Sequence, residues 1–255
     1  MKAFQVNAPH DYRVAEVEEP TAGAGEVLVR VAFAGICGSD MHIIHGDNAF
    51  VRFPRITGHE FAGVIDAVGE GVTDVAVGDR VCVDPVISCG TCYPCRINRP
   101  NVCSALEVIG VHRNGGFEEF VSVPVANVHK LPEHIGLDAA ALVEPYTIAA
   151  NVLDRMQPHP GDRLLILGAG VIGMTILQMA RALGIEEIIV TDVINERLTA
   201  AKELGATHVL NSREQEVEKE VLALTQGEGV PLIADAACVP ALLPQMLRLA
   251  SPAGR

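Results

Sequence analysis

Residues 163–173, RLLILGAGVIG, decide the fold of the second half of this chain. The first five residues form a short apolar run, which predicts a strand buried on both faces of a parallel sheet. The run leads directly into the pattern G-x-G-x-x-G, and a helical pattern follows. Glycines in this context let the backbone approach a pyrophosphate, and the N-terminus of the helix favours its charge. A tight turn without a ligand is the alternative. The predicted dinucleotide-binding residues are Gly168, Gly170, Val171, Ile172 and Gly173.

The next apolar run, residues 187–191, ends on the acidic residue Asp192. A carboxylate at this place binds the ribose hydroxyls of NAD and repels the 2′-phosphate of NADP, so NAD is the predicted cofactor. Arg197 follows on the next predicted helix and keeps NADP as an alternative, although we expect this residue to flank the ribose or the adenine.

Strand and helix patterns continue to alternate after Asp192. Further strands are predicted over 206–210 and 232–235, and helices over 171–183, 196–204, 214–225 and 241–249. This alternation predicts an α/β fold with a doubly wound parallel sheet, which begins after the Pro- and Gly-rich linker 157–162. A six-stranded sheet of this kind needs about 50 further residues. We therefore expect the chain to be truncated at its C-terminus.

The first half of the chain has a different pattern. Short strands are predicted over 26–33, 61–68, 80–83 and 117–123. Turn signals such as Asn114-Gly-Gly separate them, and short strands with frequent turns suggest a β-barrel or sandwich. The chain is therefore divided into a domain over residues 1–150 and a second domain over residues 151–255.

The composition limits the class of protein. The chain has 255 residues, of which 49% are hydrophobic, and its net charge of −13 argues against binding to nucleic-acid phosphates. No apolar run is long enough for a membrane span, and the N-terminus has no secretory signal. Seven cysteines in such a chain indicate metal or redox chemistry in the cytoplasm rather than disulfides.

Four of the cysteines are clustered with the spacing C-x2-C-x2-C-x7-C. Four thiolates on one short lobe can close a tetrahedral structural zinc site, which leaves no open position for chemistry. A [4Fe–4S] cluster is the alternative, but its fourth cysteine is usually closer and is followed by proline, whereas Ser104 follows here. The predicted ligands are Cys89, Cys92, Cys95 and Cys103.

A second candidate metal site combines residues from separate segments. Cys37 offers a thiolate and His59 an imidazole. Glu144 offers a carboxylate, with Glu60 as an alternative ligand. Three protein ligands of mixed type leave an open position on zinc. Asp40 is predicted to accept a hydrogen bond from the other ring nitrogen of His59. Spacing alone also fits a buried thiol at Cys37 and a helix-start charge at Glu144.

These motifs together resemble those of the zinc-dependent medium-chain alcohol dehydrogenase family. Residues 58–72, GHEFAGVIDAVGEGV, match the zinc signature G-H-E-x2-G-x5-G-x2-V of this family at every defined position. The Glu144-Pro145 pair stands where liver-type enzymes carry a cysteine ligand, as in the sorbitol, threonine and sugar-acid dehydrogenases. Residues 83–89 and 234–238 are similar to segments of bacterial starvation-sensing-type and L-gulonate 5-dehydrogenase-like proteins.

The resemblance implies a GroES-like, β-barrel-type catalytic domain over residues 1–150 and a NAD-binding Rossmann domain over residues 151–255. It implies two zinc ions per chain, one catalytic and one structural. The implied reaction is the oxidation of a secondary alcohol of a polyol or sugar acid, a hexonate such as L-gulonate, to a ketone with NAD. The expected partner is a small-molecule alcohol, with neither nucleic acid nor membrane, and the complete protein is expected to be a cytoplasmic homo-dimer or homo-tetramer.

The resemblance also implies roles for individual residues. Ser39 and His42 are expected to relay the proton of the alcohol outward, and Asp40, which orients His59, is counted with them as catalytic. Thr147 is expected to pack near the nicotinamide. Separately from the resemblance, Arg113 and His45 are candidates for contacting a carboxylate or hydroxyl groups of the substrate, and a solvated hairpin residue beside Asn114-Gly115 is the alternative for Arg113. Three other functions stay open: an L-threonine 3-dehydrogenase, a non-catalytic nucleotide-binding regulatory protein, and an iron–sulfur electron carrier.

Overall fold

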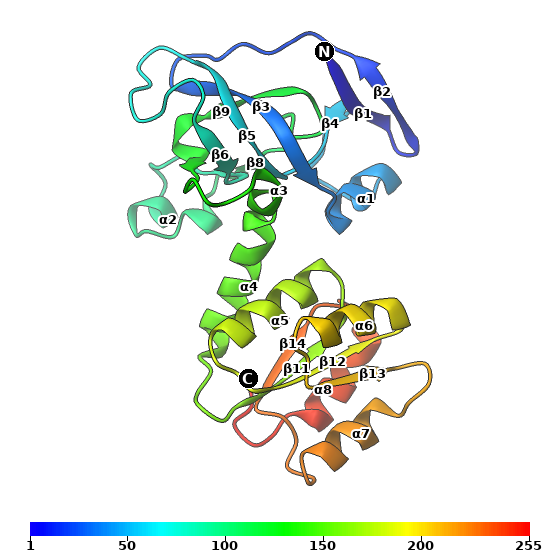
Figure 1. Cartoon of the computed structure of the whole chain (residues 1–255). Coiled ribbons are helices and arrows are strands. Elements are labelled where there is room, and N and C mark those ends of the chain that lie inside the picture. Colours follow the sequence, from blue (N-terminus) through cyan, green and yellow to red (C-terminus); the bar gives the residue numbers. More distant parts are fainter. The chain divides into compact units, whose positions relative to one another are not determined.

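The computed structural model describes residues 1–255 and divides into two compact units, Met1–Glu144 and Pro145–Arg255. Figure 1 shows the elements of each unit along the chain. The predicted fold class is confirmed, because the first unit is built on antiparallel sheets and the second on a parallel sheet with helices. No helix has both the length and the apolar character that a membrane span requires.

The first unit is organised around a five-stranded antiparallel sheet with the order β10-β6-β5-β3-β9. The bounds of its strands are β3 Glu26–Gly35, β5 Glu60–Val68, β6 Arg80–Val83, β9 Phe120–Pro124 and β10 Val128–Lys130. Val27 and Val29, alternate residues of β3, pack with Phe61 and Ile65 of β5 in one buried core. This shared core holds the ends of β3 and β5 in fixed positions.

Two smaller sheets and several short helices complete the first unit. A three-stranded sheet has the order β2-β1-β4, and β7 pairs with β8. Helix α4, Val143–Met156, spans the boundary between the units. The remaining elements are β1 Lys2–Ala8, β2 Asp11–Glu16, β4 Arg55–Ile56, β7 Val86–Ile87, β8 Glu107–Val108, α1 Gly38–His45, α2 Tyr93–Arg96, α3 Leu137–Ala140, η1 Pro100–Val102 and η2 Val125–Asn127.

The strand predicted over residues 117–123 is shorter in the structure, where β9 begins at Phe120. The residues before it pair with β1 instead. The Phe4 N–H donates to the Phe117 carbonyl (2.8 Å), and Glu118 forms a bridge with Ala3. The chain therefore passes from one sheet to the other at this point, and the crossing buries the Glu118 side chain.

The second unit contains a four-stranded parallel sheet with the order β13-β12-β11-β14. The predicted strand at residues 163–167 is β11, whose Leu164 and Ile166 face one hydrophobic core while Leu165 and Leu167 face another. Both faces of the strand are therefore covered, as its continuous apolar run predicts. The elements are β11 Arg163–Leu167, α5 Val171–Ala182, β12 Glu187–Asp192, α6 Asn195–Glu203, β13 His208–Asn211, α7 Val217–Leu224, β14 Leu232–Asp235, η3 Pro240–Leu242 and α8 Leu243–Leu249.

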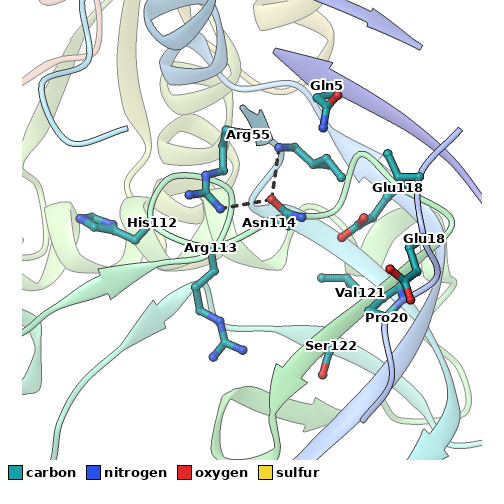
Figure 2. Close-up of a pocket in the computed structure, with 12 residues that line it drawn as sticks. Gln5, Glu18, Pro20, Arg55, His112, Arg113, Asn114, Glu118, Val121 and Ser122 are labelled. Carbon is teal, nitrogen blue, oxygen red and sulfur yellow. Dashed lines mark hydrogen bonds between the residues drawn. The ribbon is translucent and has the colours of Figure 1, made fainter. Parts of the chain in front are cut away.

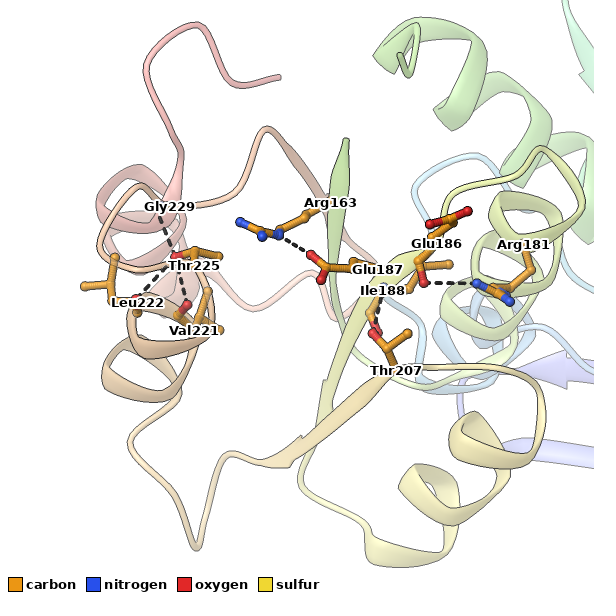
Figure 3. A network of polar contacts seen from close by, with 10 residues as sticks. All are labelled: Arg163, Arg181, Glu186, Glu187, Ile188, Thr207, Val221, Leu222, Thr225 and Gly229. Atoms are coloured by element: carbon orange, nitrogen blue, oxygen red, sulfur yellow. Dashed lines mark hydrogen bonds and ion pairs between the residues drawn. The ribbon is translucent and has the colours of Figure 1, made fainter. Parts of the chain in front are cut away.

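A hydrogen-bonded threonine and an ion pair connect neighbouring strands of this sheet (Figure 3). The Thr207 hydroxyl donates to the Ile188 carbonyl (2.8 Å) and accepts the Ile188 N–H (2.9 Å). These two bonds continue the β12–β13 ladder into the segment before β13. Arg163 and Glu187 form an ion pair between the first residues of β11 and β12. The sheet is thereby held in the register that aligns the carboxyl ends of its strands.

Candidate active site

Three possible metal ligands meet at one end of the five-stranded sheet. The Cys37 thiol, the His59 ring and the Glu60 carboxylate each place a ligand atom within 4.8 Å of the others. The pairing of β3 with β5 sets Gly35 opposite Glu60, so the chain that leaves β3 reaches Cys37 beside the start of β5. The pairing of two strands that are distant in sequence therefore creates the cluster.

Two glycines make room for the cluster. Gly58 has a φ of +92°, and a Cβ at this position would lie 2.7 Å from the Phe117 ring. A Cβ on Gly35 would collide with the Glu60 carboxylate. Glycine at both positions therefore leaves room for the Phe117 ring and the Glu60 side chain next to the cluster.

Asp40 holds the two ligand-bearing segments together. Its side chain is buried, and its carboxylate accepts the Cys37 N–H (2.9 Å) and the Gly58 N–H (3.1 Å). The sequence predicts a hydrogen bond from the His59 ring to Asp40, whereas the structure shows these two backbone bonds. The reason is local, because Asp40 is the third residue of α1 and its side chain caps the N–H of Cys37 at the N-cap position.

The cluster brings together three ionisable groups, a thiol, an imidazole and a carboxyl group, whose pKa values are all shifted. The hydrogen bond with His59 lowers the pKa of the Cys37 thiol. Burial opposes ionisation of the His59 ring, but the hydrogen bond with Cys37 and nearby negative charges raise its pKa to about 9. Burial raises the pKa of Glu60. A thiolate, an imidazole and a carboxylate suit a metal of borderline softness such as zinc, which would replace the imidazolium proton.

Glu144, the other predicted carboxylate ligand, lies outside this group of three. It is partly buried near the start of α4 and interacts electrostatically with His59 and Glu60. Burial raises its pKa. In this structure Glu60, the alternative ligand, is therefore the carboxylate that forms a compact group with Cys37 and His59.

The two residues predicted to relay a proton lie on α1. Ser39 hydrogen-bonds to the Cys37 thiol through its side chain and its backbone. The His42 side chain, one turn further along, is 68% exposed, and its Nδ1 lies 4.0 Å from the Asp47 carboxylate. The structure thus places Ser39 at the metal cluster and His42 at the surface.

The four cysteines of the predicted structural zinc lobe form a second cluster. Their sulfurs lie within 4.8 Å of one another, and none of them is in a disulfide. The Cys89 N–H donates to the Cys103 sulfur (3.3 Å), and the Cys92 N–H donates to the Cys89 sulfur (3.4 Å). Hydrogen bonds, first those from Thr91, lower the pKa of Cys89 to about 7, while burial and neighbouring thiols raise the pKa of Cys95 to about 12. Four close sulfurs that cannot all ionise by themselves fit a tetrahedral zinc site.

The glycine motif lies between β11 and α5, as the sequence predicts. Gly168 has a φ of +99°, and a Cβ there would lie 2.9 Å from the backbone that follows β14. A Cβ on Gly173 would collide with the Gly168 carbonyl. Gly170 is the N-cap of α5, and Val171 and Ile172 are the first residues of its first turn. The motif therefore leads the chain directly to a helix N-terminus, whose N–H groups can bind a phosphate.

A cavity of about 370 Å³ opens beside this loop, and Asp192 lines it at the end of β12. The Asp192 side chain is buried, and its carboxylate accepts the Ala169 N–H (2.7 Å) and the Val193 N–H (2.8 Å). The Arg197 guanidinium lies 3.7 Å from the same carboxylate. The acidic residue therefore anchors the glycine loop as well as facing the cavity.

The cavity has further lining residues that the sequence analysis missed. Ser212 follows β13 directly, and Ala236 and Ala237 follow β14. Their places after predicted strands were an available signal, because the carboxyl ends of parallel strands meet at one edge of the sheet. Gln245, on α8, also lines the cavity and carried no such signal.

The sequence also predicts a contact of Thr147 with the cofactor and of Arg113 with the substrate. Thr147 is an exposed residue of α4 in the second unit. Arg113 forms an ion pair with Glu26 at 2.5 Å, so its charge is already balanced within the first unit. Arg113 also lines a cavity of the first unit to which none of the candidate zinc ligands contributes.

The chain matches two family models. Residues 23–133 match the alcohol dehydrogenase GroES-like domain, and residues 171–255 match the zinc-binding dehydrogenase domain. The starvation-sensing protein RspB of Escherichia coli K12 is 49% identical over all of this chain and 75% of that protein. The L-threonine 3-dehydrogenase of Pyrococcus furiosus is 38% identical over 94% of this chain and 70% of that protein. The sorbitol dehydrogenase of Bacillus subtilis is 36% identical over 97% of this chain and 71% of that protein.

Solved structures agree with these matches. The structure of rspB from E. coli CFT073 in complex with NADH has a TM-score of 0.92 at 49% identity, covering 100% of this chain and 74% of that one. The structure of a zinc-binding dehydrogenase from Sinorhizobium meliloti 1021 bound to NADP has a TM-score of 0.95 at 33% identity. The match covers 99% of this chain and 74% of that one. The two matching domain models, the sequence identities and the two candidate metal sites all indicate the same family. The chain therefore belongs to the zinc-dependent medium-chain alcohol dehydrogenase family and is a zinc-type alcohol or polyol dehydrogenase.

Proposed function

We propose that this chain oxidises a secondary alcohol of a polyol or sugar acid, a hexonate such as L-gulonate, to a ketone with NAD. The observation that carries the proposal is the cluster of Cys37, His59 and Glu60, whose sulfur, nitrogen and oxygen ligands suit a catalytic zinc. The substrate class is supported by the relative named sorbitol dehydrogenase and by the likeness of residues 83–89 and 234–238 to sugar-acid dehydrogenases.

The protein's own residues would position the reactants. When bound, the zinc supplies Lewis-acid stabilisation of an alkoxide and the nicotinamide supplies a hydride acceptor. Cys37, His59 and Glu60 would hold the catalytic zinc. Glu144 is the alternative carboxylate, since its charge also acts on His59. Asp40 keeps the two ligand-bearing segments in place through its two backbone hydrogen bonds.

A second zinc ion is proposed for the four-cysteine lobe, which makes two per chain. Its ligands would be four thiolates, a set that closes the coordination sphere and leaves no position for a substrate. This ion would stabilise the lobe between β7 and β8 and take no part in the reaction. The proposed ligands are Cys89, Cys92, Cys95 and Cys103.

The proton of the alcohol is proposed to leave along α1. Ser39 would accept it beside the metal cluster, and His42 would pass it to water. The hydrogen bond of Ser39 to Cys37 and the exposure of His42 one turn later support this direction of transfer.

NAD rather than NADP is the proposed cofactor. The buried carboxylate of Asp192 lines the cavity beside the glycine loop, where it would bind ribose hydroxyls and repel a 2′-phosphate. Arg197, which would be needed for the phosphate, is already drawn to Asp192. Thr147 is proposed to pack near the nicotinamide. The two solved relatives contain NADH in one case and NADP in the other, so the preference has to be measured.

A substrate screen tests the proposal. The zinc-loaded protein is mixed with NAD or NADP and with L-gulonate, other hexonates, sorbitol or L-threonine, and nucleotide reduction is followed by absorbance. We expect the highest kcat/KM for a hexonate or polyol with NAD. L-threonine as the best substrate would establish the alternative suggested by the P. furiosus relative. No turnover by a protein that carries zinc would support a non-catalytic regulatory protein instead.

Metal analysis and light scattering complete the test. Two zinc ions per chain would agree with the proposal, whereas iron in the four-cysteine lobe would support an electron carrier. We propose that the protein assembles as a homo-dimer or homo-tetramer, and the molar mass in solution decides between these and a monomer.

A further inference from the structure

A polar cavity of about 550 Å³ lies in the first unit (Figure 2), and none of the residues proposed to hold zinc lines it. It is formed by β1, by the segment after β2, by β4 and by the residues from His112 to Ser122. Its volume is in the range of cavities that bind small molecules. The polar residues that line it are Gln5, Glu18, Arg55, His112, Arg113, Asn114, Glu118 and Ser122.

Arg55 brings a positive charge to this cavity without a matching acid. Its Nη1 donates to the Asn114 side-chain oxygen (3.1 Å), which is a neutral partner. Its Nε is buried and has no hydrogen-bond partner. Burial lowers the pKa of Arg55, which reflects the cost of a guanidinium in this environment. A carboxylate from outside the chain would therefore be a favourable partner for Arg55.

Glu118 brings an acidic group to the cavity, also without a charged partner in the chain. Its side chain is only 8% exposed and takes part in no hydrogen bond or ion pair. Burial alone raises its pKa to about 8. Buried polar side chains in proteins are almost always hydrogen-bonded to protein or to water, and no group of the chain pairs with Glu118, so its carboxyl group in the wall of the cavity is open to a donor from a bound ligand.

Negative and positive side chains lie on different sides of the cavity. Arg113 is balanced by Glu26, which also accepts the Ser122 hydroxyl (2.9 Å). Figure 2 shows Glu18 and Glu118 on one side of the cavity and Arg55 on another. A ligand that matches this lining has an anionic group for Arg55 and a cationic donor for the two acids, and an ammonium group beside Glu118 would favour the ionised form of its carboxyl group.

We propose that this cavity binds a small zwitterion, a free α-amino acid, with its carboxylate on Arg55 and its ammonium group on Glu118. A pure anion would meet the two acids, and a pure cation would meet the guanidinium, so each would satisfy only half of the site. The site is independent of the proposed dehydrogenase reaction, because no candidate zinc or cofactor ligand lines it.

Isothermal titration calorimetry of the intact, zinc-loaded protein with three matched probes tests this site. L-Alanine has both charged groups, propionate has only the carboxylate, and ethylamine has only the ammonium group. None of them has a hydroxyl group, so none can be an alcohol substrate. We expect L-alanine to bind at least tenfold more tightly than either other probe. Equal binding of L-alanine and propionate, or no binding of L-alanine, would overturn the proposal without any variant.

Variants then locate the binding. Arg55→Gln and Glu118→Gln should each weaken L-alanine binding at least tenfold. Their matched controls are Arg52→Gln and Glu119→Gln, exposed neighbours that do not line the cavity. Circular dichroism checks the fold of each variant. L-alanine affinity that is unchanged in folded Arg55→Gln or Glu118→Gln would place the ligand elsewhere and refute the assignment.

Discussion

Replacing Glu118 by glutamine should stabilise this protein at alkaline pH. Burial raises the pKa of Glu118 from 4.5 to about 8. Between these values the unfolded chain has an ionised carboxylate, while the folded chain keeps the group protonated. Because the folded state binds the extra proton, the stability of the wild type must fall as the pH rises through this window, and the loss is complete above about pH 8.

The size of the effect follows from the same shift. A rise of this extent corresponds to at most about 4 to 5 kcal/mol between the two protonation states. The cavity beside Glu118 admits water, which lowers the cost of ionisation, so we expect about 2 to 4 kcal/mol. Glutamine has no proton to lose, and the variant should therefore lack this contribution to the pH dependence.

Urea unfolding at pH 5 and pH 9 measures the difference. The stability of Glu118→Gln relative to the wild type should increase by about 2 to 4 kcal/mol between the two conditions. All other titrating groups are common to both proteins, so they cancel in this comparison. Glu119→Gln, the exposed neighbour, should follow the wild type at both values. Parallel pH profiles for the wild type and Glu118→Gln would refute the assignment of a buried, partnerless carboxyl group.

Three further predictions concern the candidate active site. Cys37→Ser should remove one zinc ion per chain and abolish turnover while the four-cysteine lobe keeps its zinc; loss of both ions together, seen by metal analysis, would argue against two separate sites. Asp40→Ala should lower the free energy of unfolding in urea by about 1 to 3 kcal/mol, because the N–H groups of Cys37 and Gly58 lose their acceptor. Asp47→Ala, an exposed control, should lower it much less. Equal losses in the two variants would contradict the role of Asp40 in holding the two segments together. Asp192→Ala should weaken NAD binding by roughly 10- to 100-fold in fluorescence titration, through lost charge-assisted hydrogen bonds and a loosened Ala169 backbone; an unchanged NAD dissociation constant would exclude the proposed contact with the ribose.

The sequence alone predicts the elements whose chemistry is local. The run of residues 163–167 followed by Gly168, Gly170 and Gly173 predicts a strand, a tight turn and a helix start, because each depends on neighbouring residues only. The spacing of the four cysteines likewise brings them onto one short lobe. These features could be read without knowing how distant segments pack.

The arrangement of the catalytic cluster needs the tertiary structure. The sequence offers Glu144 as the carboxylate ligand and Glu60 as the alternative, and only the pairing of β3 with β5 gathers Glu60 with Cys37 and His59. The sequence also assigns Asp40 to the His59 ring, whereas its place in the first turn of α1 directs it to two backbone N–H groups. Such choices depend on distances between segments, which spacing along the chain does not specify.

Glu118 shows the same division most clearly. In the sequence it is one of two adjacent glutamates in a predicted strand, and nothing distinguishes it from Glu119. In the structure the chain crosses between two sheets at this point, so Glu118 is buried beside a cavity and Glu119 is exposed. The sequence by itself therefore determined the two domains, the glycine loop and the kinds of metal ligand, since these rest on local pattern. Only the tertiary structure decided which carboxyl groups are buried, paired or left without a partner, because burial and pairing depend on contacts between segments far apart in the chain.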